Sequence, residues 1–110
     1  MIHDTIARIE AQIRNSANLS EERRAELAAL LATLKAEVGE LAKTHGEQAA
    51  SIAGFAQVSA HEATRSQPNP EALQHSLSGL EASVSEFEKS HPRLVNIVNS
   101  ISHTLSNLGI

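Results

Sequence analysis

The chain of 110 residues contains no cysteine, tryptophan or tyrosine, and only two phenylalanines. Without cysteine it can form no disulfide, no thiolate metal site and no thiol nucleophile. The scarcity of aromatic residues disfavours a β-rich domain, because strands draw on aromatic and β-branched side chains. Leucine, alanine and isoleucine supply the apolar content instead, which is typical of a helical bundle.

Long apolar runs and strong charge are also missing. No apolar stretch approaches the roughly 20 residues that a membrane-spanning helix needs. The first residues lack the basic start and apolar run of a signal peptide. The net charge of -4 is small and evenly spread, which argues against a nucleic-acid partner. We therefore expect a cytoplasmic protein with no transmembrane segment.

Apolar residues recur at steps of three and four, the period of a helix with one buried side. Ser20 and Asn69 suit the N-caps of two such helices, and Pro70 suits the first helical position after Asn69. The pattern predicts helices over about residues 2–15, 21–65, 70–88 and 92–108.

The long stretch 21–65 weakens near residues 45–48, where His45 and Gln48 fall on its apolar seam and Gly46 disfavours helix. We expect a kink there, and a full break stays open. A histidine at a seam position can set register or respond to pH, because imidazole changes charge near neutral pH. His45 is therefore a candidate for both roles.

A row of small residues, seven apart, runs beside this seam and predicts close contact with a neighbouring helix. The alternative is that alanine is there only because it is the best helix former. The predicted contact residues are Ala25, Ala32, Gly39, Gly46, Ala53 and Ala60.

These patterns predict one all-α domain over residues 1–110. It should be an antiparallel bundle of about four helices around one long central helix, with coiled-coil-like packing. The isoleucine seam of the first helix then has too few partners within the chain, which predicts a homo-oligomer, most simply a dimer. The expected interface residues are Ile2, Ile6, Ile9, Ile13, Leu27, Leu31 and Leu34.

No residue pattern supports catalysis, a cofactor or a metal ion. Glu88 and His91 have the spacing used in di-metal bundles, but the required second copy of that motif is missing. His61 and Glu62 resemble part of a zinc-protease helix, yet Arg65 stands where the second histidine belongs. An ion pair between Glu62 and Arg65 explains that spacing more simply.

The segment Phe87-Glu88-Lys89-Ser90-His91-Pro92-Arg93-Leu94 and the ending Leu105-Ser106-Asn107-Leu108-Gly109-Ile110 resemble a family of short bacterial helical proteins of unknown function. Its members read F-E-x-x-H-P-x-L near the end and close on a leucine-rich turn with Gly-Ile. The resemblance extends through residues 51–65. It implies a bacterial origin and no activity, cofactor or catalytic residue.

We therefore expect a non-catalytic interaction or scaffold protein that self-associates, with a further protein partner left open. The alternative is a binder of an apolar surface, such as a membrane, a granule or a partner helix. The uncharged polar face of the last helix favours a binder of an apolar surface. The lack of the Lys, Arg and Trp residues expected on interfacial helices argues against such a binder. A histidine-based metal- or ligand-binding bundle is a third class.

Overall fold

The computed structural model describes residues 2–108, and these are helical throughout apart from turns, with no strand. The prediction of an all-α fold is confirmed. A short 3-10 turn, η1, follows the fourth helix. The elements are α1 (Ile2–Arg14), α2 (Glu21–Ala42), α3 (Gly46–Thr64), α4 (Pro70–Val84), η1 (Ser85–Phe87) and α5 (Pro92–Leu108).

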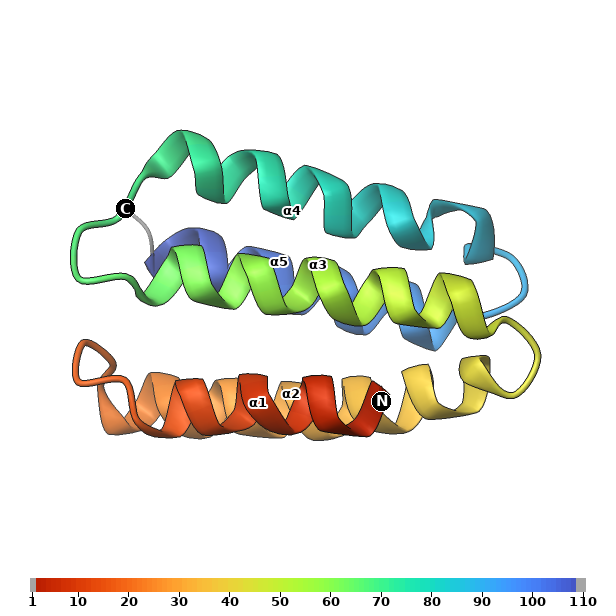
Figure 1. Cartoon of the computed structure of the whole chain (residues 1–110), viewed down its shortest axis with the longest axis horizontal. Helices are drawn as coiled ribbons and strands as arrows, with labels where there is room; N and C mark the ends of the chain where they lie inside the picture. Colours follow the sequence, from red (N-terminus) through yellow and green to blue (C-terminus); the bar gives the residue numbers. More distant parts are fainter. Residues whose placement is uncertain (1, 109–110) are drawn as a thin grey trace.

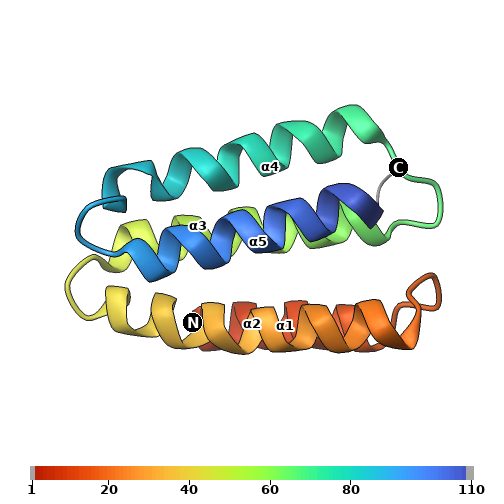
Figure 2. The same ribbon diagram turned by 180° about the vertical axis from the view of Figure 1, so that it is seen from behind.

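The helices alternate in direction along the chain, so α1, α3 and α5 run one way while α2 and α4 run the other (Figure 1). Helices α1 and α2 form one layer, α3 and α5 the middle, and α4 covers them on the far side (Figure 2). Helix α3 packs against each of the other four helices. It is therefore the centre of the fold.

The stretch 21–65, expected as one long helix with a kink or a full break near residues 45–48, is fully broken, because the chain reverses direction between Ala42 and Gly46. At the end of α2 the amide of His45 bonds back to the carbonyl of Leu41 at 2.8 Å. Helix α3 then begins at Gly46 with His45 at its N-cap position. The weak helix formers at residues 45–46 mark a turn between two antiparallel helices rather than a kink.

The starts of α2 and α4 follow the predicted capping chemistry. Ser20 accepts a hydrogen bond from the backbone amide of Arg23 at 3.1 Å. Asn69 Oδ1 accepts from the amides of Glu71 and Ala72, both at 3.1 Å. Each cap satisfies amides that have no partner within their helix. Gly109 and Ile110, which have the sequence of a helix-terminating glycine followed by an apolar residue, lie outside the described residues.

The isoleucine seam of α1 finds its partners within the chain, which corrects the expectation that a second copy must cover it. Helix α1 packs against both α2 and α3. Ile6, Ile9 and Ile13 are at most 1% exposed, and Ile2 is half-buried. Leu27, Leu31 and Leu34 are buried as well. Apart from Ile2, which packs at the edge of the core, these side chains are buried in the core and are not available as an oligomer interface.

The row of small residues is divided by the turn into two parts with different surroundings. Ala53 and Ala60 are buried in α3, where they allow neighbouring helices to approach closely. Ala25, Ala32 and Gly46 are exposed, and Gly39 is half-buried beside the ring of His3. The buried members of the row are thus Ala53 and Ala60 of α3, whereas Ala25 and Ala32 of α2 and Gly46 at the start of α3 lie away from the core.

Within residues 2–108 no helix combines the length and the apolar character that crossing a membrane requires.

Candidate functional site

Three rings meet at the end of the bundle where α2 turns into α3 and where α5 begins. The rings of His45 and His91 each lie edge-on to Phe87, with ring centres 5.4 Å apart in both pairs. The two histidine rings are 6.3 Å apart and also nearly perpendicular. We call this group the ring cluster. It joins two turns that are far apart in the sequence.

The placement of His45 differs from the expectation of a seam residue inside a long helix. It lies in the turn, half-buried, and makes no side-chain cap to α3. Its Nδ1 atom lies 2.7 Å from the hydroxyl of Thr44. His91 has the same relation to Ser90, at 2.9 Å. Both histidines are thus held by the hydroxyl of the residue before them.

This similarity reflects an internal repeat that was not among the predictions from the sequence. Residues 27–45 recur 46 positions later, so the hairpin α2–α3 corresponds to the hairpin α4–α5. The signal was visible as Lys-Thr-His and Lys-Ser-His, each following a helix and preceding Gly or Pro. The identical pairs are Leu27/Leu73, Leu31/Leu77, Leu34/Leu80, Ala36/Ala82, Val38/Val84, Glu40/Glu86, Lys43/Lys89 and His45/His91.

The helix contacts agree with this repeat. If the two hairpins are equivalent, the contact between α2 and α5 should have a counterpart between α4 and α3. Both contacts are present. Helices α3 and α5, which also correspond, run in the same direction (Figures 1 and 2). The two hairpins are therefore related by an approximate two-fold axis along the bundle. Because His45 and His91 correspond, the axis passes between them.

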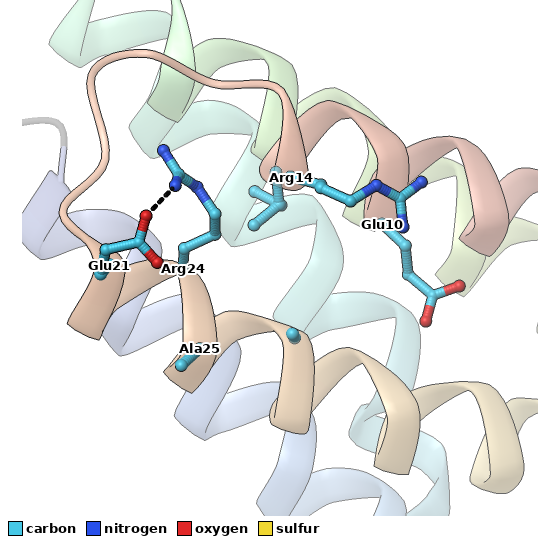
Figure 3. Close-up of a pocket in the computed structure, with 7 residues that line it drawn as sticks. Glu10, Arg14, Glu21, Arg24 and Ala25 are labelled. Carbon is cyan, nitrogen blue, oxygen red and sulfur yellow. Dashed lines mark hydrogen bonds and ion pairs between the residues drawn. The ribbon is translucent and has the colours of Figure 1, made fainter.

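A hollow of about 300 Å³ lies between α1 and α2 near their connecting loop. Ile13, Ala25 and Ala28 line it, and Arg24 stands at its edge (Figure 3). Arg24 donates to the carbonyls of Ser16 and Leu19 at 2.8 and 3.1 Å and pairs with Glu21 at 2.9 Å. These bonds hold the loop against α2, which assigns Arg24 a structural role.

The outer face of α3 carries exposed apolar side chains. Phe55 is 40% exposed and Val58 is 50% exposed, and no other large apolar side chain of the described chain is as exposed. The ring of Phe55 lies against Gly79 of α4. The stretch 48–60 contains no Asp, Glu, Lys or Arg. We call Phe55, Val58 and the uncharged surface of this stretch the α3 face.

The predicted ion pair between Glu62 and Arg65 is present, with Arg65 Nη1 2.8 Å from Glu62 Oε1. Residues 2–108 contain no group of three or more His, Asp or Glu side chains arranged to hold a metal ion. Glu88 and His91 therefore do not gather the further acidic ligands that a di-metal bundle uses.

The fold and these surfaces define an all-helical protein made of two corresponding hairpins and one additional N-terminal helix. Residues 27–110 match DUF4404, a domain of unknown function, and the chain belongs to this family. The match begins at the first residue of the internal repeat. No curated protein and no solved structure matches the chain.

Proposed function

We propose that the protein is a non-catalytic interaction module that associates with a second copy of itself through the α3 face. The observation that carries this proposal is the exposure of Phe55 and Val58 on the central helix. Large apolar side chains grouped at the surface of a protein mark a contact surface, because their exposure to water is unfavourable.

The charge distribution favours a second copy as the occupant. The chain has a net charge of -4, so two copies repel one another at most orientations. A two-fold contact places the same patch of each copy against itself. Because residues 48–60 carry no charged side chain, copies that meet at the α3 face bring no like charges into direct contact. Charged residues are also depleted at the centres of protein interfaces.

An apolar surface other than a second copy, such as a membrane or granule, is the competing occupant. The α3 face offers Phe55 and Val58 but no Lys, Arg or Trp within residues 48–60. Interfacial helices use such residues to engage anionic lipids and headgroups. The composition therefore supports a protein occupant over a lipid one.

The test is to compare the parent protein with Val58→Glu by sedimentation velocity across about 1–200 µM. Val58 is half exposed, so a glutamate at this position faces solvent in the free chain and leaves the fold intact. In a face-to-face dimer it places two carboxylates against each other. We expect the parent to form a dimer and Val58→Glu to remain a monomer.

Asn96→Glu is the matched control, because it adds the same charge at an exposed position on α5. It should dimerise as the parent does. A parent that stays monomeric at 200 µM contradicts the proposal, as does loss of the dimer in both variants. A monomer that co-sediments with lipid vesicles would assign the α3 face to lipid instead. The cytoplasmic location and the absence of catalysis stay predictions.

A further inference from the structure

The two Lys-(Ser/Thr)-His turns of the internal repeat converge at one end of the bundle. Each turn closes with a histidine amide bonded to the carbonyl four residues earlier, at 2.8 Å for both His45 and His91. Each histidine also precedes the first residue of a helix. Repeated local structure has therefore placed two equivalent imidazoles beside each other on the approximate two-fold axis.

We propose that His45 and His91 bind a divalent transition-metal ion of the zinc or nickel class through their Nε2 atoms. Neutral imidazole is a preferred ligand of these ions. Each histidine already has a hydroxyl oxygen against Nδ1, and within residues 2–108 neither Nε2 atom makes a hydrogen bond or an ion pair. The Nε2 atoms of His45 and His91 are therefore the two nitrogens of the ring cluster that remain available to bind a metal ion.

The hydrogen bonds around Thr44 are compatible with a proton on Nδ1 of His45. The Thr44 hydroxyl donates to the carbonyl of Leu41 at 3.4 Å. Its oxygen is then free to accept from the Nδ1–H of His45 at 2.7 Å. In neutral imidazole this leaves a lone pair on Nε2. Histidines that bind metals use the same arrangement, in which a second hydrogen bond fixes the tautomer and the ring orientation.

The separation of the rings suits one shared ion. Imidazole nitrogens lie about 2.0–2.1 Å from zinc, which places two ring centres on one ion about 5–6 Å apart. The ring centres of His45 and His91 are 6.3 Å apart, so the two rings must approach by at least about 0.3 Å to share one ion. Phe87 packs edge-on against both rings at 5.4 Å. It restricts the directions in which they turn.

The site would have two protein ligands. Within residues 2–108 no third His, Asp or Glu forms a metal-binding group with these two. Water completes the coordination of zinc wherever a site keeps open positions. An open two-histidine site binds an ion weakly and exchanges it readily, which suits reversible occupancy.

The experiment titrates metal-free protein with zinc chloride at pH 7.5 by isothermal calorimetry. The variants are His45→Phe and His91→Phe, because phenylalanine keeps a ring against Phe87 while removing the nitrogen. We expect each variant to bind zinc more than about tenfold more weakly than the parent. Thr44→Val keeps both histidines and removes the partner of Nδ1, and should weaken binding by about 10–100-fold.

His103→Phe is the control, because His103 is exposed on α5 outside the ring cluster. It should bind zinc as the parent does. Nitrogen-15 spectra of the imidazoles should show the Nε2 signals of His45 and His91 shifting together on zinc addition. Parental affinity in either His45→Phe or His91→Phe overturns the proposal. So does equal loss in His103→Phe, or a parent that binds no zinc at 1 mM.

Discussion

The ring of Phe55 on α3 lies directly against the backbone of Gly79 on α4. A Cβ atom built at Gly79 would lie 2.7 Å from Cδ1 of Phe55 and closer still to Cε1. Real Cβ atoms do not approach a carbon so closely, so any side chain at this position must displace the ring. A glycine inside a helix costs about 1 kcal/mol relative to alanine. The contact with the Phe55 ring explains why α4 has a glycine at position 79 despite this cost.

Substituting Gly79 by alanine should reveal this contact. In the parent, the gain in helix propensity is offset by displacement of the Phe55 ring, so we expect no increase in the free energy of unfolding. In a Phe55→Ala background the ring is absent, and Gly79→Ala should stabilise the protein by about 1 kcal/mol. Urea unfolding of the four proteins measures the coupling.

Gly54→Ala is the matched control for that cycle, since nothing lies within 4 Å of a Cβ built at Gly54. It should stabilise the protein by about 0.5–1 kcal/mol in both backgrounds. If Gly79→Ala stabilises the protein equally with and without the Phe55 ring, then the ring does not exclude a side chain at residue 79.

Replacing Ile9 by aspartate should abolish folding rather than dissociate an assembly. Ile9 is 1% exposed between α1 and its neighbours, and an unpaired carboxylate there loses its hydration without gaining a partner. Ile9→Ala should lower the free energy of unfolding by about 2–5 kcal/mol. Circular dichroism checks both. Full helicity in Ile9→Asp would restore the earlier interface hypothesis.

Asn69→Ala should destabilise the protein by about 1–2 kcal/mol, because Asn69 caps two amides at the start of α4. Ser20→Ala removes a cap that accepts from one amide only, and should cost less. Thermal melts of the two variants test this order. A larger effect at Ser20 would mean that the number of capped amides does not decide the cost.

Arg24→Lys should destabilise the loop between α1 and α2 although the charge is kept. The Arg24 guanidinium donates to Ser16, Leu19 and Glu21 at once, and an ammonium group cannot reproduce that planar fork. We expect a loss of about 1 kcal/mol and faster amide exchange across residues 15–20. Arg23→Lys is the control, because within the described part of the chain the Arg23 side chain makes only a 3.7 Å ion pair with Glu26. It should be neutral.

The sequence by itself determined the local structure of this protein. The steps of three and four between apolar residues showed that each helix has one buried side, because a residue's face on a helix follows from its spacing alone. Ser20, Asn69 and Pro70 marked helix starts, since capping depends on neighbours within the same turn. The last helix was expected over residues 92–108 and is found at Pro92–Leu108.

Only the tertiary structure decided which helix faces pack against each other. The spacing of Ile6, Ile9 and Ile13 says that one side of α1 is buried but does not name the partner. That partner became available when the chain reversed at Lys43–His45 and brought α3 beside α1.

The internal repeat makes the same point with two equivalent positions. Ala53 on α3 is buried at 1% exposure, whereas the corresponding Asn99 on α5 is exposed. The difference arises because α1 packs on the first hairpin and no described helix packs on the equivalent side of the second. Residues 53 and 99 hold the same position in their hairpins but differ in type, so burial there depends on the residue itself and on contacts between segments distant in the chain.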